Sequence, residues 1–150
     1  MTLRKTQPVK ADLHQLIDRL LISYQPVATH QKSFFINQVP RDFLINTDQE
    51  ILCTLLGSLF YIIARRSRDT SIIIAVSAYD DVTVLQIKDT NSLNNYAVLY
   101  EFQHLKMLSE KIGGFLDISN CRNKETIISF SFANFMANCE SIPVRALKRA

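Results

Sequence analysis

In the stretch "TVLQIKDTNSLNNY", residues 83–96, an alternating strand pattern ends at an aspartate, and a polar loop without glycine follows. Successive side chains of a strand point to opposite faces, so Leu85, Ile87 and Asp89 share one face. This face is the more apolar one, and we expect helices to cover it. Asp89 is then a carboxylate on the core side, which needs hydrogen-bond donors because burying an unpaired charge is costly. Either it caps the loop through backbone N–H groups, or it faces a ligand.

The composition is typical of one globular domain. The chain has 150 residues, 47% of them hydrophobic, with a mean hydropathy of +0.05, which is enough for a sizeable core. The net charge of +3 points to no particular partner. No signal peptide is visible, and the longest apolar run, about 51–64, is too short to cross a bilayer. Three cysteines without metal-like spacing favour reduced thiols. We therefore expect a cytoplasmic protein without membrane insertion.

The first half of the chain contains two amphipathic helix patterns. Asp12 is a candidate N-cap for the first, and Thr47 or Asp48 for the second. The second ends in several arginines, which the helix dipole favours at that end. The elements predicted here are a helix from 12 to about 30, strands over 34–36 and 43–45, and a helix from 48 to about 66.

The second half is rich in strands. Residues 71–79 and 82–89 form a predicted hairpin across Asp80-Asp81, and 115–119 and 126–132 form another. Between them, a helix pattern over 96–112 ends at Gly113-Gly114, as is common at helix C-termini. The order predicts an α+β fold: a two-layer sandwich in which helices cover one face of a mixed, mostly antiparallel sheet. We expect residues 1–132 to form this domain and residues 133–150 to be a C-terminal tail or linker.

A second polar group lies at a strand end on the core side. In the last predicted strand, Thr126 shares its face with Ile128, Phe130 and Phe132. The helix that begins near residue 48 also has a second side, opposite its leucines. Small residues on that side leave room either for another helix or loop, or for a ligand. This second side contains Thr54, Gly57, Ser58, Tyr61 and Arg65.

These segments together resemble the ATP-binding catalytic domain of sensor histidine kinases, which has the Bergerat (GHKL) fold. The resemblance covers about residues 8–132. "VKADLHQLIDRLLISYQPVATHQKSFFINQVP" is similar to the family's opening strand, helix and second strand, and "NTDQEILCTLLGSLFYIIARRS" to its "D-x-x-R-L-x-Q-V-L-x-N-L-L-x-N-A" helix. "VTVLQIKDTNS" resembles the strand that ends in the "D-x-G-x-G" box. "LYEFQHLKMLSEKIGGFLDISNCRNKETIISFSF" resembles the late helix, its glycine stop and the two closing strands.

The resemblance implies a role for the two polar residues at strand ends. In the family, the aspartate of the glycine box accepts a hydrogen bond from the adenine amino group, and Asp89 matches it. A threonine on one of the last two strands commonly helps to hold the adenine, and Thr126 falls at that place.

The positions that would handle phosphates and Mg²⁺ depart from the family's motifs. The Mg²⁺-binding asparagine corresponds to Tyr61, and the asparagine one turn earlier to Gly57. A phenol cannot supply the amide oxygen that suits this hard cation. The basic residue three positions later becomes Ala64. The glycines of the box become Asn91 and Leu93, which do not readily adopt a positive φ.

If a nucleotide still binds, ATP with Mg²⁺ is the possible cofactor, and Arg65 or Arg66 would have to reach the phosphates. The loop over 90–97 is too short to form the family's lid. We assign no catalytic residue and no metal ligand. His14 and His104 lack the family's phosphoacceptor context, and we expect both at the surface or in helix packing. The residues that would bind a nucleotide, if binding is retained, are Asp89, Thr126, Gly57 and Tyr61.

Two functions remain open at this point. The first is a degenerate histidine-kinase-type domain, an interaction module of a two-component system with lost or weakened ATP binding. Its partner would be a helical dimerisation and phosphotransfer domain, a receiver domain, or a second copy of itself. The second is a divergent but functional ATP-binding catalytic domain of a sensor histidine kinase. Nucleic acid is not expected as a partner, because no recognition motif accompanies the arginines.

Overall fold

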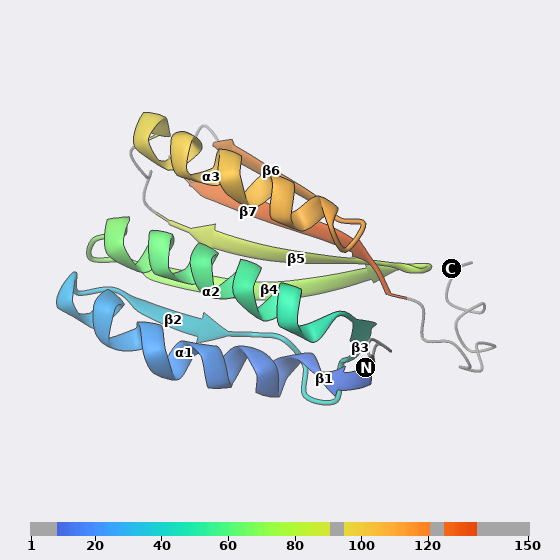
Figure 1. The fold of residues 1–150 in the computed structure, drawn as a ribbon. Coiled ribbons are helices and arrows are strands. Elements are labelled where there is room, and N and C mark those ends of the chain that lie inside the picture. Colours follow the sequence, from blue (N-terminus) through green and yellow to red (C-terminus); the bar gives the residue numbers. More distant parts are fainter. Residues whose placement is uncertain (1–8, 91–94, 121–124, 135–150) are drawn as a thin grey trace.

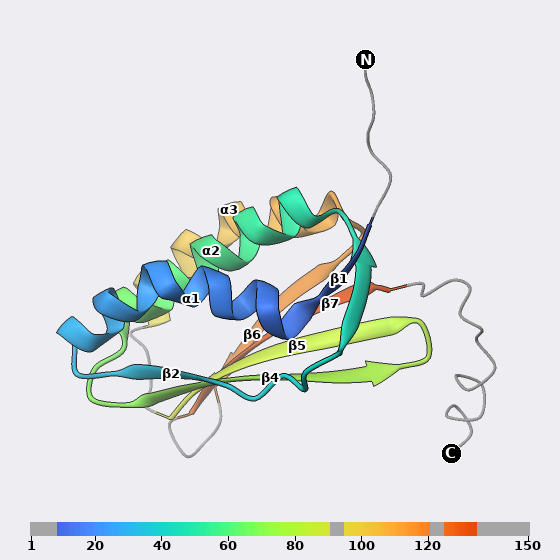
Figure 2. The ribbon, with the colours of Figure 1, turned by 90° about the horizontal axis from the view of Figure 1, so that it is seen from below.

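Three helices lie side by side over one face of a sheet in the computed structural model of the chain, which describes residues 9–90, 95–120 and 125–134 (Figure 1). Figure 2 shows the same layers from the side, with α1, α2 and α3 together on one face. This arrangement is the predicted two-layer α+β sandwich. The elements are β1 (Val9–Asp12), α1 (Leu13–His30), β2 (Phe34–Asn37), β3 (Leu44–Thr47), α2 (Gln49–Arg66), β4 (Ser71–Tyr79), β5 (Val82–Asp89), α3 (Asn95–Glu110), β6 (Phe115–Asn120) and β7 (Thr126–Ala133).

The main sheet contains five of the described strands, in the order β2-β4-β5-β7-β6. Strands β2 and β4 run parallel and all other neighbours are antiparallel, so the sheet is mixed and mostly antiparallel, as predicted. The hairpins β4–β5 and β6–β7 are the two expected from the strand patterns. Strand β3 pairs instead with β1 in a separate two-stranded sheet. Only the resemblance implied β1, because four residues are too few to show a convincing alternation.

Aspartate side chains begin the first two helices. Asp12 accepts a hydrogen bond from the backbone N–H of Gln15 (3.2 Å), and Asp48 accepts one from Ile51 (3.1 Å). Such caps satisfy N–H groups that have no partner within the helix. Both predicted caps are confirmed, with Asp48 rather than Thr47 at α2. None of the described helices combines the length and apolar character needed to cross a membrane.

The core lies between the helices and the covered face of the sheet. Leu85, Ile87 and Asp89 of β5 are buried there, whereas Val82 and Gln86 are exposed on the open face. The alternation predicted from the sequence is therefore confirmed for β5. It holds for β7 as well, whose buried residues are Thr126, Ile128, Phe130 and Phe132.

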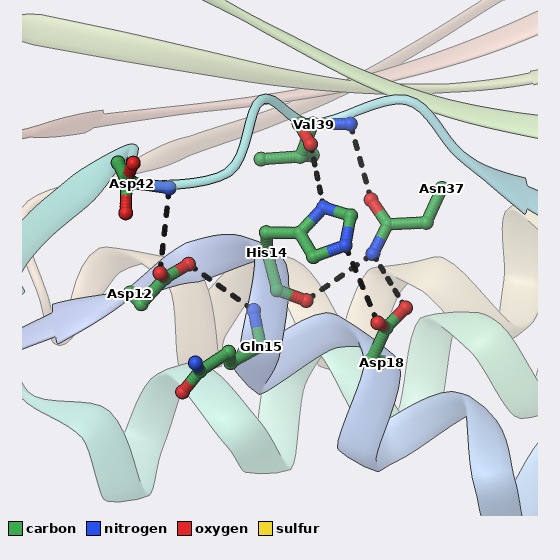
Figure 3. Close-up of polar contacts among 7 residues, drawn as sticks. All are labelled: Asp12, His14, Gln15, Asp18, Asn37, Val39 and Asp42. Atoms are coloured by element: carbon green, nitrogen blue, oxygen red, sulfur yellow. Dashed lines mark hydrogen bonds and ion pairs between the residues drawn. The ribbon is translucent and has the colours of Figure 1, made fainter.

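A polar network ties the N-terminal end of α1 to the loop after β2 (Figure 3). The Nδ1 atom of His14 lies 2.6 Å from the carbonyl oxygen of Val39, and its Nε2 atom lies 3.3 Å from Asp18 Oδ2. Asn37 donates from Nδ2 to Asp18 Oδ1 (2.8 Å) and to the carbonyl of His14 (3.2 Å). His14 is therefore a buried residue of the helix packing, whereas His104 is exposed on α3.

Asn134 joins the end of β7 to the small sheet and to β5. Its Oδ1 accepts a hydrogen bond from the backbone N–H of Asn46 (2.7 Å), and its Nδ2 donates to the carbonyl of Leu44 (3.2 Å) and to Thr83 Oγ1 (3.1 Å). Strand β7 thus continues slightly beyond the expected boundary at residue 132. The rest of the predicted tail lies outside the described residues.

Candidate functional site

Asp89 is buried at the end of β5, beneath the C-terminal end of α2. Asp89 is only 2% exposed. Ser67, the C-cap of α2, donates a hydrogen bond from its hydroxyl group to Oδ2 of Asp89. In the sheet register Asp89 stands opposite Thr126 of β7, which is 1% exposed. The structure thus brings the two predicted adenine-side residues together on the covered face. Their role in binding a base stays a prediction.

Hydroxyl groups of further residues form a network that begins at Ser67. Ser33 donates to the carbonyl oxygen of Ser67 (3.2 Å) and accepts from the backbone N–H of Thr70 (3.2 Å). The hydroxyl of Thr70 in turn contacts that of Thr90. Sequence reasoning missed these residues, because single serines and threonines at loop ends carry no signal of a shared site. The loop 91–94, which was expected either to receive the Asp89 cap or to border a ligand, lies outside the described residues.

Gly57 and Tyr61 lie elsewhere, in an open groove of about 460 Å³ between α1 and α2. A Cβ atom added to Gly57 would lie 3.1 Å from the hydroxyl of Tyr24, so the small residue at 57 makes room for α1. Tyr61 is 44% exposed, and its ring centroid lies 6.2 Å from that of Tyr24. The residues that line the groove are Tyr24, Cys53, Thr54, Gly57, Ser58 and Tyr61.

The four predicted nucleotide-binding residues therefore form two separate pairs. Asp89 and Thr126 meet under the end of α2, whereas Gly57 and Tyr61 line the groove on the side of α2 that faces α1. Gly57 and Tyr61 lie together because positions four residues apart fall about one turn apart on the same side of a helix. That side of α2 faces α1 and not Asp89. Packing by another helix, one of the two alternatives for this stripe, is what the structure shows at Gly57.

The arginines at the end of α2 bind a carboxylate of α3. Arg65 Nη2 lies 2.9 Å from Glu101 Oε2, and Arg66 Nε lies 3.2 Å from Glu101 Oε1. The guanidinium of Arg65 also lies over the ring of Tyr61, 5.0 Å from its centroid, a favourable cation–π geometry. Hydrogen bonds and charge from Arg66 and Arg65 lower the pKa of Glu101, against a smaller opposing effect of burial.

This ion pair predicts a pH-dependent contribution to stability. Because the pKa of Glu101 is lowered by folding, the contribution is present above the ordinary glutamate pKa of about 4.3 and is lost as the pH falls through the folded value. We expect Glu101→Gln to lower the free energy of unfolding by about 1 kcal/mol at pH 7, because the carboxylate is partly buried and accepts a hydrogen bond from each of two arginines. The difference from the unmodified protein should become smaller as the pH is lowered from 7 to 3. Urea unfolding followed by circular dichroism at both pH values measures it.

Glu110→Gln is the matched control, since Glu110 is exposed on the same helix. It should change the free energy of unfolding by less than about 0.5 kcal/mol at either pH. A loss that is the same at pH 7 and pH 3 for Glu101→Gln would contradict an electrostatic contribution and point to packing alone.

The residues of α2 that were predicted on the phosphate side of a nucleotide site already have partners within the protein. Tyr61 packs against Tyr24, and Arg65 and Arg66 hold Glu101. Within residues 9–90, 95–120 and 125–134, no group of three or more histidine, cysteine, aspartate or glutamate side chains is placed to hold a metal ion. On the predicted base side, Asp89 and Thr126 are both buried and stand opposite each other in the sheet register.

No family model matches this sequence, and no curated protein matches it. Several solved structures are similar in fold. The chain is similar to the Acinetobacter baumannii histidine kinase AdeS, with a TM-score of 0.75 and 14% identity over 89% of this chain and 70% of that one. It is similar to the mycobacterial sensor histidine kinase MprB, with a TM-score of 0.66 and 16% identity over 85% of this chain and 97% of that one.

The chain is also similar to the catalytic domain of histidine kinase ThkA, with a TM-score of 0.72 and 11% identity over 86% of this chain and 97% of that one. At identities this low, the likeness establishes the fold alone. The chain has the α+β fold of histidine kinase catalytic domains over most of its length, as the resemblance implied.

Proposed function

We propose that this chain is a degenerate histidine-kinase-type domain that acts as an interaction module in a two-component system, with lost or weakened ATP binding. One observation carries the proposal: the side chains of α2 that could reach phosphates are committed within the protein. Arg65 and Arg66 are both bound to Glu101, and Tyr61 lies against Tyr24. The absence of glycine at positions 91 and 93 supports the same reading.

The base side retains part of what an adenine would need. The carboxylate of Asp89 is buried and held by Ser67, with Thr126 opposite in the sheet. A ligand amino group would have to share the Asp89 carboxylate with Ser67. Such a contact is independent of metal ions, so any residual nucleotide binding should not require Mg²⁺.

The expected partner is another cytoplasmic two-component protein: a helical dimerisation and phosphotransfer domain, a receiver domain, or a second copy of this chain. Support comes from the solved structures of similar fold, which are histidine kinases by name. The groove between α1 and α2, with its half-exposed Tyr61, is where we expect contact. Aromatic residues are enriched in protein interfaces.

Isothermal titration calorimetry with ATP and ADP, each with and without Mg²⁺, tests the loss of nucleotide handling. We expect either no binding or binding with a dissociation constant of about 1 mM that is unchanged by Mg²⁺, because only base-side contacts remain. Tight ATP binding that depends on Mg²⁺ would overturn the proposal. The Asp89→Asn variant serves as the matched control, since any residual binding through the base should disappear in it.

A divergent but functional ATP-binding catalytic domain is the second candidate. The observation in its favour is the pairing of Asp89 and Thr126 at adjoining strand ends on the covered face. In this case Mg²⁺-dependent ATP binding should be present, Asp89→Asn should weaken it, and phosphate should be transferred to a histidine on a linked helical domain. If Asp89→Asn leaves a measurable nucleotide affinity unchanged, this candidate fails.

A further inference from the structure

The open face of the main sheet lies opposite the three helices, and Figure 2 shows no described element that covers it. In an antiparallel sheet with one face in water, the outward positions are usually polar. Strand β4 instead reads "SIIIAVSAY", a nearly continuous apolar run of the kind found in strands that are covered on both faces. The outward apolar side chains of the sheet include Phe34, Ile73, Tyr79, Val84, Phe115 and Ile127.

Large apolar side chains are spread across this open face. Phe34 of β2 is 50% exposed, Tyr79 of β4 62% and Phe115 of β6 66%. In the middle of the face, the small residues Ala75 and Ser129 flank β5 in the sheet register. Sheets that pack face to face lie about 10 Å apart, and small side chains permit that approach. Exposed apolar side chains gathered on one face mark an interaction surface, whereas scattered ones do not.

Only two charged side chains point outward from the five described strands of the main sheet, Lys88 of β5 and Asp117 of β6. They lie on opposite sides of β7, Lys88 beside Ile127 and Asp117 beside Ser129. No ion pair within residues 9–90, 95–120 and 125–134 includes either of them. A two-fold axis that runs between two facing sheets, over β7, places Lys88 of each copy opposite Asp117 of the other. The open face is therefore complementary in charge to itself.

We propose that the open face of the sheet is a self-association surface, on which a second copy of this chain packs sheet against sheet, with Lys88 of each copy paired to Asp117 of the other. Burial of the apolar side chains drives the association, and the two charge pairs fix its orientation. The inference builds on the proposed function, because it selects a second copy among the partners considered there and assigns it a surface. The groove between α1 and α2 lies in the other layer and stays accessible in both copies (Figure 2).

Sedimentation equilibrium of the chain without nucleotide tests the proposal. The monomer of 17.2 kDa should convert to a dimer as its concentration rises. Half conversion is expected at roughly 100 µM, as for a weak interface, so unfolding experiments at a few micromolar report on the monomer. Val84→Lys places a charge in the middle of the open face and should weaken the dimer about tenfold or more. Met107→Lys is the matched control, because Met107 is 68% exposed on α3 in the other layer, and it should leave the association unchanged.

Exchange of the two charges tests the two-fold geometry. Lys88→Asp alone and Asp117→Lys alone should each weaken self-association about tenfold, because like charges then face each other. An equal mixture of these two variants should form a dimer about as tight as that of the unmodified chain, because each acidic side chain then meets a basic one. The double variant Lys88→Asp with Asp117→Lys should also associate as the unmodified chain does, for the same reason.

Three results would overturn the proposal. A chain that stays monomeric up to about 1 mM would leave the open face to a different partner. Equal association of Val84→Lys and Met107→Lys would place the contact on another surface. A mixture of Lys88→Asp and Asp117→Lys that associates no better than either variant alone would contradict the two-fold pairing. Circular dichroism verifies that each variant is folded. Failure of the proposed function would show separately, as tight Mg²⁺-dependent ATP binding, whatever the oligomeric state.

Discussion

Gly114→Ala is expected to destabilise the domain by about 3 kcal/mol, because the added methyl group has no space and part of its surroundings cannot move. A Cβ atom at this position would lie 2.5 Å from Phe130 Cε1 and 2.8 Å from the backbone carbonyl oxygen of Ser131. The phenyl ring is itself packed against Phe132, at 5.1 Å between centroids. Relief would therefore require a shift of β7 or of the turn between α3 and β6.

Gly113→Ala is the matched control, one residue away in the same turn. No atom lies within 4 Å of a Cβ atom at Gly113, but its φ of +68° is a conformation that alanine adopts with strain. The expected loss is about 1 kcal/mol, from backbone strain alone. Urea unfolding followed by circular dichroism gives both values. Equal losses of stability for the two variants would contradict the prediction, because the contact of a Cβ atom at position 114 with β7 would then add nothing to the loss.

Asp89→Ala is expected to lower the free energy of unfolding by about 2–3 kcal/mol, because it leaves the buried hydroxyl of Ser67 without its acceptor and opens a polar cavity. The contact spans the two layers, since Ser67 ends α2 and Asp89 ends β5. Asp89→Asn keeps an oxygen acceptor for Ser67, and its loss should be less than half as large. Chemical unfolding at pH 7 measures both.

Asp117→Ala is the matched control for Asp89, because Asp117 is an exposed aspartate on β6. Its effect should stay within about 0.5 kcal/mol. If Asp89→Ala falls in the same range, the carboxylate does not hold α2 to the sheet. Its burial would then have to be explained by a ligand-binding role alone. The Asp89→Asn titrations described above would decide that point.

Local signals predicted most of the fold. The caps Asp12 and Asp48 bind N–H groups three residues further on, so a short window of sequence contains both partners. Alternation along β5 and β7 placed Asp89 and Thr126 on the covered face. The glycine stop of α3 also lies within such a window, because Gly113 and Gly114 donate to carbonyls of the preceding turn.

The candidate site was predicted only in part, because its decisive contacts join residues far apart in the sequence. Ser67 and Asp89 are 22 positions apart, and Arg65 and Glu101 are 36 positions apart. Which residues meet at such distances depends on how α2 packs between α1 and α3. Tyr24, the neighbour of Gly57, and Glu101, the partner of two arginines, both lie outside any short sequence window around the residues they contact.

The sequence by itself determined the hydrophobic periodicities of the helices and strands, the helix caps, and the sheet face on which Asp89 and Thr126 lie. These features follow from backbone geometry over a few residues. The tertiary structure alone decided that Gly57 and Tyr61 face α1, that Ser67 holds Asp89, and that Glu101 binds the arginines at the end of α2. These outcomes depend on side chains brought together by packing of the layers. For the same reason, the placement of Asp89 and Thr126 on the covered face was visible in the sequence, whereas the pairing of Arg65 and Arg66 with Glu101 was not.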